Sequence, residues 1–260
     1  MTGIERIAGA FEGRSGRAAL MPYLMGGFPD RDTALAIGRA YADSGADLVE
    51  LGVPFSDPLA DGPVIQEAGA RALEAGATPE SVLETASALS ETVPVVLMTY
   101  GNLVMARGAD EFVSDLASSG VSGLIVPDLP LEESGELGDA CESRGIALVP
   151  LAAPTSSDER LEQIGSQARG FLYTVSVSGT TGERSGDEGY AEIIERARSH
   201  SEVPVALGFG ISTPEQASAA AEAGADGVIV GSRLVREAAE SADPASACGA
   251  LVGRFAQALR

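Results

Sequence analysis

The sequence predicts a single (β/α)8 barrel, because it repeats one pattern of strand, loop and helix eight times in 260 residues. In most repeats a glycine ends a helix, an apolar strand follows, and a polar or Gly/Pro loop ends the strand. Nearly continuous apolar runs are typical of parallel strands covered on both faces. Four expected strands lie within the segments 44–52, 119–128, 144–152 and 223–232, and four more lie at 19–25, 93–100, 171–175 and 203–208. An open doubly wound sheet is the alternative, since strand count alone does not prove closure.

Helical patterns fill the intervals between these strands. Thr78 and Thr213 each precede a proline with an acidic residue close behind, which is favourable chemistry for a helix start. An additional helix at 4–11 is expected to close the bottom of the barrel, so that 1–260 forms one catalytic domain. The other expected helices lie at 32–44, 63–75, 79–90, 110–119, 131–144, 158–166, 190–198, 214–223, 233–239 and 245–259.

Composition excludes several classes of function. The formal net charge is −21, with 38 acidic and 17 basic residues, so a basic face for nucleic acid is not expected. The chain has no lysine, which excludes Schiff-base chemistry. Its only histidine, His200, stands in a polar run and is expected at a solvated helix end. Neither a zinc site nor a Ser-His-Asp triad is therefore expected.

The sequence favours a cytoplasmic protein without a membrane segment. No apolar run reaches membrane length, and Glu5 and Glu12 interrupt anything that resembles a signal sequence. Cys141 and Cys248 lie far apart on expected helices, which suits reduced core thiols better than a disulfide.

Three carboxylates follow closely on one another around the end of the second expected strand, in ELGVPFSDPLADG. Glu50 interrupts an apolar strand near the barrel mouth, where burial would raise its pKa toward that of a general acid/base. It could instead satisfy a local arginine or backbone donors. Asp57 precedes a proline and is favoured as a turn residue. Asp61 could serve the site or merely cap the helix that begins at Pro63.

Glycine-rich segments follow three neighbouring expected strands: 178–186, 208–212 and 231–232. Their backbone N–H groups can approach an anion closely, and the helix beginning at Arg233 would direct its positive end at the same place. A phosphate group is the expected occupant, because barrels of this kind bind phosphate after strands seven and eight. The segment at 208–212 does not complete a dinucleotide motif, since Thr213 stands at its last position.

The loop from Ser176 to Gly189 is rich in Gly, Ser and Thr and could be a mobile lid or an ordinary solvated loop. Tyr23, Tyr100 and Tyr173 stand at strand ends, where each could pack in the core or point its hydroxyl into the site.

Together these motifs resemble the tryptophan synthase alpha subunit family, whose members are (β/α)8 TIM barrels. The resemblance covers almost the whole chain, with every motif in the family's order. The matching segments are LVELGVPFSDPLADGP (48–63), YLMGGFPD (23–30), LMTYGN (97–102), IVPDLP (125–130), FLYTVSVSGTTG (171–182), GFGIS (208–212) and VGS (230–232).

The resemblance implies a lyase of tryptophan biosynthesis that splits indole-3-glycerol phosphate into indole and glyceraldehyde 3-phosphate. By the same resemblance, Glu50 is the general acid/base, Asp61 holds the indole N–H, and Thr181 meets Asp61 when the lid closes. The residues that would hold the phosphate are Gly182, Gly210, Gly231 and Ser232. Those that would form the walls are Tyr23, Tyr100, Tyr173 and Phe209.

The resemblance also implies a partner. The family's alpha subunit binds a beta subunit that contains pyridoxal phosphate (PLP), in an allosteric α2β2 heterotetramer, while the alpha chain itself needs no metal or organic cofactor. Two alternatives stay open on the residues alone. One is another phosphosugar lyase or isomerase that uses the same acids. The other is a phosphate-binding regulator without activity, although such a protein would not need both Glu50 and Asp61.

Overall fold

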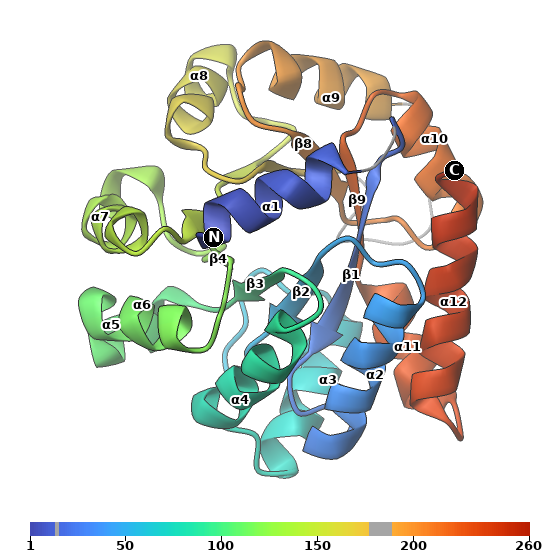
Figure 1. Cartoon of the computed structure of the whole chain (residues 1–260). Helices are drawn as coiled ribbons and strands as arrows, with labels where there is room; N and C mark the ends of the chain where they lie inside the picture. Colours follow the sequence, from blue (N-terminus) through green and yellow to red (C-terminus); the bar gives the residue numbers. More distant parts are fainter. Residues whose placement is uncertain (14–15, 177–188) are drawn as a thin grey trace.

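The computed structural model describes residues 1–13, 16–176 and 189–260. Its parallel strands are surrounded by helices (Figure 1). The strands are β1 (Ala19–Met25), β2 (Val49–Gly52), β3 (Val95–Met98), β4 (Gly123–Ile125), β5 (Ala147–Leu148), β6 (Leu151–Ala152), β7 (Leu172–Val175), β8 (Val205–Gly208) and β9 (Gly227–Val230). The helices are α1 (Gly3–Glu12), α2 (Arg31–Asp43), α3 (Pro63–Glu74), α4 (Pro79–Ser90), α5 (Gly101–Arg107), α6 (Ala109–Ser118), the 3-10 helix η1 (Leu131–Glu133), α7 (Gly135–Ser143), α8 (Asp158–Gln167), α9 (Tyr190–Ser199), α10 (Pro214–Glu222), α11 (Ser232–Glu240) and α12 (Pro244–Ala258).

The strands close into a barrel through one interrupted strand. The sheet order is β5-β4-β3-β2-β1-β9-β8-β7-β6, and its two end strands, β5 and β6, are separated in the chain by only Val149 and Pro150. Val149 N–H donates to Leu124 of β4 at 2.9 Å, and the carbonyl of Pro150 accepts from Tyr173 of β7 at 3.1 Å. This segment therefore pairs on both sides and is the eighth strand position. Proline lacks an N–H, which breaks the regular ladder at this point.

Helix α1 closes the N-terminal end of the barrel, as expected; in Figure 1 it crosses the strands inside the ring of other helices. Ile7 is fully buried against Gly123 at the start of β4, and the ring of Phe11 packs 5.7 Å from that of Phe171 just before β7. The Arg6 guanidinium donates to three carbonyls on two connections that lead into strands: Ser90 and Val93 before β3, and Gly120 before β4. The opposite end of the barrel remains available for the site.

The structure departs from the expected elements at three places. The expected helix at 131–144 begins with the separate turn η1, and the expected strand at 93–100 is shorter. Helix α5 was not expected at all. It begins directly after Tyr100, where Gly101 N–H donates to the Asp128 carboxylate at 2.8 Å. A tertiary contact from β4's loop thus supports a seven-residue helix, which is too short to show a clear amphipathic period.

Two further expectations concern the cysteines and membrane-spanning helices. Cys141 on α7 and Cys248 on α12 are both buried and free, and burial raises the pKa of each thiol, to about 12 and about 11. Of the helices in the described ranges, none combines the length and the apolar character needed to cross a bilayer.

Candidate active site

A cavity of about 550 Å³ lies at the C-terminal ends of the strands. Each strand position around the barrel contributes one side chain to its wall, either from the strand or from the residue directly after it. These residues are Tyr23 of β1, Glu50 of β2, Met98 of β3, Ile125 of β4, Leu151 of β6, Tyr173 of β7, Phe209 after β8 and Ile229 of β9. The cavity is therefore the mouth of the barrel itself.

Glu50 lines this cavity from within β2, two residues before the strand ends. It stands opposite Tyr23 of β1 in the parallel register and is only 4% exposed. Burial, with a smaller contribution from Asp61, raises the pKa of Glu50 to about 8. Within the described residues no arginine or hydrogen-bond donor holds it, so an ion pair with those residues does not account for its position. At neutral pH this carboxyl is mainly protonated and can deliver a proton.

Asp61 faces the same cavity and does not cap a helix. The residue at the start of α3 is Gly62, which makes no side-chain capping bond. Burial raises the pKa of Asp61, while the hydroxyl of Tyr100 opposes this rise by hydrogen bonding to the carboxylate. The sequence therefore brings two carboxyl groups with raised pKa values to one cavity, which is common at functional sites.

Tyr100 holds the loop beside the cavity, although it is not among the described residues that line the cavity itself. Its hydroxyl accepts from Ala60 N–H at 3.1 Å, and its ring stacks on Phe55 with centroids 5.2 Å apart. Tyr100 thereby holds the loop that carries Asp61. Asp57 on the same loop is exposed and accepts from the Ser56 hydroxyl at 2.5 Å.

The turns after β8 and β9 meet at another part of the cavity. Phe209 has φ 63° and Gly210 has φ 86°, so two successive residues adopt the left-handed conformation. This conformation is rare for a bulky residue, and such outliers cluster at functional sites. Gly210, Gly231 and Ser232 all line the cavity. Two of the three expected glycine turns therefore converge. The third turn, with Thr181, Gly182 and most of the expected Ser176–Gly189 lid, lies outside the described residues.

Tyr23 and Tyr173 form aromatic parts of the wall. Burial raises the pKa of both hydroxyls well above the usual value, so both stay neutral. Phe209 packs against Tyr173 in an edge arrangement, with ring centroids 6.2 Å apart. The site thus combines a large apolar and aromatic surface with two acids and an exposed backbone turn, an arrangement suited to an aromatic ligand that carries an anionic group.

Comparison with known proteins identifies the family. A family model described as tryptophan synthase alpha chain matches residues 11–259. The chain belongs to this family. It is 48% identical over 250 residues to the tryptophan synthase alpha chain of Synechococcus sp. (strain CC9902), covering 95% of this chain and 92% of that relative.

Solved structures agree with this assignment. A chain of tryptophan synthase from M. tuberculosis superimposes with a TM-score of 0.90 at 37% identity, covering 98% of both chains. A chain of the tryptophan synthase complex from Pyrococcus furiosus gives a TM-score of 0.85 at 35% identity, covering 92% of this chain and 98% of that one. As a tryptophan synthase alpha chain, the protein is a lyase of tryptophan biosynthesis. It cleaves indole-3-glycerol phosphate to indole and glyceraldehyde 3-phosphate.

Several lining residues of this alpha chain were not identified from the sequence. Apolar side chains at strand ends carry no chemical signal of their own, and their direction depends on the register of the barrel. Such positions could have been found by aligning each strand to Glu50 in the sheet. The residues concerned are Ile65, Met98, Ile125, Leu151, Tyr190, Ile211 and Ile229, with Ser212, Gln216, Arg233 and Arg236 as polar additions.

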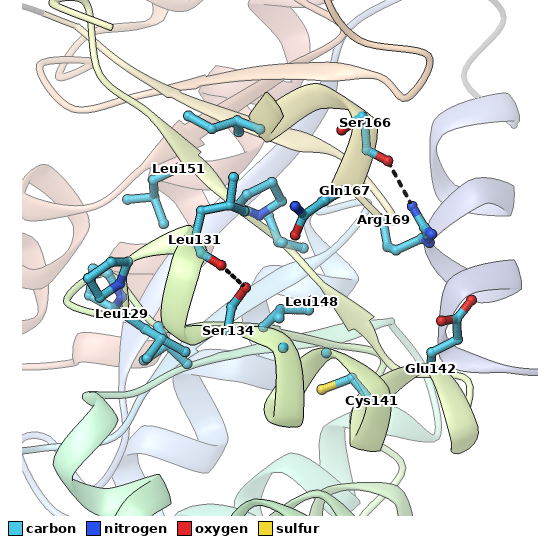
Figure 2. Close-up of a pocket in the computed structure, with 18 of the residues that line it drawn as sticks. Leu129, Leu131, Ser134, Cys141, Glu142, Leu148, Leu151, Ser166, Gln167 and Arg169 are labelled. Atoms are coloured by element: carbon cyan, nitrogen blue, oxygen red, sulfur yellow. Dashed lines mark hydrogen bonds between the residues drawn. The ribbon is translucent and has the colours of Figure 1, made fainter. Parts of the chain in front are cut away.

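A second cavity of about 420 Å³ lies between α7, α8 and the interrupted strand (Figure 2). Its polar groups are largely satisfied by the protein: the Ser134 hydroxyl donates to the Leu131 carbonyl at 2.7 Å, and Arg169 to the Ser166 carbonyl at 3.5 Å. Leu151 lines both cavities, so the two share a wall. The two acids that line this second space, Asp139 and Glu142, are exposed residues of α7, whereas Glu50 at the barrel mouth is buried.

No group of three or more His, Cys, Asp or Glu side chains in the described ranges could hold a metal ion. His200 ends α9, with Nε2 4.0 Å from the Asp158 carboxylate and its side chain 25% exposed. It is a partly buried helix-end residue, less solvated than expected, and is not among the residues that line the barrel mouth.

Proposed function

We propose that Glu50 and Asp61 carry out the carbon-carbon cleavage, with 1–260 acting as one catalytic domain. Protonated Glu50 delivers a proton to the indole carbon that bears the glycerol chain. Ionised Asp61 accepts a hydrogen bond from the ring N–H and stabilises the positive charge that develops there. Glu50, now a carboxylate, then takes the proton of the neighbouring glycerol hydroxyl. The carbon-carbon bond breaks, the aldehyde forms, and the bonding electrons return to the ring.

The pKa values support this assignment of roles. A carboxyl with a pKa of about 8 starts the cycle protonated at neutral pH and becomes a competent base once it has lost its proton. Asp61 has the hydroxyl of Tyr100 to favour its ionised form. The observation that carries the proposal is that these two carboxyls, in different electrostatic environments, face one cavity.

The substrate's phosphate is proposed to bind at the other side of the cavity, on the backbone of Gly210, Gly231 and Ser232, with Gly182 completing the set. Gly231 is the N-cap of α11, whose helix dipole favours an anion. Tyr23, Tyr173 and Phe209 would enclose the indole ring. Thr181 is proposed to approach Asp61 when the loop closes, which would exclude water and strengthen the electrostatic contribution of Asp61.

Glu50→Gln tests the acid/base role. We expect kcat for indole formation to fall about 100-fold or more, because a positioned acid/base group contributes roughly 10² to 10⁴-fold. Competitive inhibition by inorganic phosphate should stay near the wild-type value. Asp57→Asn, the same chemical change on an exposed acid of the next loop, is the matched control and should keep nearly full activity. A Glu50→Gln enzyme that retains more than about a tenth of wild-type turnover would contradict the role.

We also propose that the chain assembles with a beta subunit in an α2β2 heterotetramer in the cytoplasm, with PLP in the beta subunit and no cofactor in this chain. The Pyrococcus furiosus neighbour is a chain of a tryptophan synthase complex. Two large apolar side chains stand exposed beside the site, Leu59 at 86% and Met105 at 78%, on the two segments joined by Tyr100. We propose that these two side chains belong to the surface that the beta subunit covers.

Mass measurement of the mixed subunits in solution tests the assembly. A mass equal to two of each chain is expected, and Leu59→Ser with Met105→Ser should weaken it. Separate peaks at micromolar concentrations, with no rise in indole formation on mixing, would contradict the partnership.

A further inference from the structure

The cavity contains two acids but also two cations, both on α11. Of the described residues that line it, only Arg233 and Arg236 are basic. Arg233 is already engaged, since its guanidinium lies 2.7 Å from the Glu237 carboxylate. Arg236 has no ion pair or hydrogen bond with any residue in the described part of the chain, and its side chain is exposed at the cavity. One positive charge is thus left available to a ligand in a chain of net charge −21.

The helix geometry places this charge near the proposed phosphate position. Ser232 begins α11 and Arg236 follows four residues later, so both lie on the same face of the helix. Helical side chains lean toward the N-terminus, and the long Arg236 side chain therefore extends over the turn that contains Ser232. The N-terminal end of α11 opens into the same cavity through Gly231 and Ser232.

The backbone groups proposed to hold the phosphate, here called the phosphate cradle, do not by themselves balance its negative charge. Gly210, Gly231 and Ser232 offer N–H groups and a hydroxyl, none of which carries a full charge, while the substrate brings a phosphate with nearly two negative charges. Ionised Asp61 repels that anion from the same cavity, as does the acidic surface at longer range. An unpaired guanidinium at the mouth offsets this repulsion and attracts the substrate in the correct orientation, with its phosphate toward α11.

We infer that Arg236 is a specificity-determining residue, which steers the phosphate of the substrate to the start of α11 and pairs with it there. This inference rests on the proposed placement of the phosphate at Gly231 and Ser232. It assigns Arg236 a role in substrate capture and none in the proton transfers, so its effect belongs in KM and in the rate of association. Because the charge lies at an exposed position, the effect is sensitive to salt.

Arg236→Gln tests the inference on the full-length chain with indole-3-glycerol phosphate as substrate. We expect KM to rise about three- to tenfold with kcat within about twofold of wild type, the range for a partly exposed charged hydrogen bond. The Ki of inorganic phosphate, used as a competitive inhibitor, should rise by the same factor. The fall of kcat/KM with added salt should become shallower than in wild type.

Two variants control the experiment. Arg39→Gln removes the same charge from an exposed position on α2 away from the cavity and should leave KM, Ki and the salt dependence unchanged. Arg236→Lys keeps the positive charge and should restore most of the affinity. If Arg236→Gln matches Arg39→Gln in KM and Ki, the inference about Arg236 is wrong, but the proposed phosphate cradle at Gly231 and Ser232 is not contradicted. If phosphate does not compete with substrate even in the wild type, the cradle itself is wrong and the role of Arg236 falls with it.

Discussion

The hydroxyl of Tyr173 on β7 fills the space beside Gly208 on β8, so closely that a Cβ built on Gly208 would lie 2.3 Å from the hydroxyl oxygen. Tyr23 on β1 stands in the same relation to Gly52 on β2, where the corresponding distance is 2.0 Å. On both sides of the barrel, a glycine at the end of one strand therefore makes room for a tyrosine of the preceding strand in the sheet.

Gly208→Ala is expected to displace Tyr173 into the cavity, because a Cβ there would overlap the tyrosine ring and Tyr173 already lines the cavity. The free energy of unfolding should fall by about 1–3 kcal/mol, as for other overpacked cores, and KM for indole-3-glycerol phosphate should rise. Denaturant unfolding and steady-state kinetics measure the two effects. Gly253→Ala on α12, where a Cβ would meet nothing within 4 Å, is the matched control and should stabilise the protein slightly. Wild-type KM in the Gly208→Ala enzyme would show that the tyrosine has room to move elsewhere.

Glu50 makes the stability of the fold depend on pH. Its pKa is raised from 4.5 in the unfolded chain to about 8 in the folded protein, so the folded state binds the proton more tightly. The contribution to stability is fully present below pH 4.5 and is lost as the pH rises through 8. Glu50→Gln removes this dependence, and the variant should gain stability relative to wild type between about pH 5 and 8.5, by a few kcal/mol at most. Denaturant unfolding of both proteins at both pH values measures this gain. If the free energies of unfolding of the two proteins change with pH in parallel, the proposed contribution of Glu50 is ruled out.

Tyr100→Phe should shift the acid limb of the pH-rate profile to higher pH. The Tyr100 hydroxyl lowers the pKa of Asp61 by stabilising its ionised form, and phenylalanine cannot do so. At a given acidic pH, a larger fraction of the variant enzyme would then carry a protonated, inactive Asp61. At higher pH, where Asp61 is ionised in both enzymes, the variant should retain part of the wild-type activity. The profile of kcat against pH for both enzymes is the measurement. Tyr41→Phe is the control for the loss of a buried tyrosine hydroxyl, since the Tyr41 hydroxyl on α2 donates to the backbone carbonyl of Tyr23. An unchanged acid limb in Tyr100→Phe would contradict the role of the Tyr100 hydroxyl in lowering the pKa of Asp61.

Arg6→Met should destabilise the fold without changing the chemistry. The variant keeps an apolar side chain of similar length but leaves the carbonyls of Ser90, Val93 and Gly120 without their donor. We expect a loss of about 1–3 kcal/mol in unfolding free energy, the cost of buried polar groups without partners. Because α1 lies at the opposite end of the barrel from Glu50, kcat at room temperature should stay near wild type. A variant as stable as wild type would mean that these carbonyls find water instead.

Residues with a distinctive chemistry at a strand end could be predicted from the sequence. Glu50 was visible because a carboxylate interrupts an apolar strand, and Asp61 because it precedes a helix start at the same edge. Gly231 and Ser232 were visible because glycine turns repeat after neighbouring strands. The order of strands in a parallel barrel then brings such positions together, whatever the details of the loops.

Other features depend on tertiary contacts that no local pattern contains. The bond from Ala60 N–H to the Tyr100 hydroxyl joins two segments 40 residues apart, so no local pattern contains it. The left-handed conformation of Phe209 contradicts the local preference of a bulky residue. Arg236 resembles any exposed helical arginine until α11 is placed at the cavity.

The closure of the barrel by α1 has a consequence for the order of events during synthesis. Its side chains meet Gly123, Phe171 and Gly227, so α1 is synthesised well before its last partner, which follows roughly 200 positions later. Until then Ile7 and Phe11 have no complete burial place, and the nascent chain carries an unsheltered apolar helix. Docking of this helix is therefore a late step of folding. The protein should need chaperones most before that step, while the apolar side chains of α1 are not fully buried.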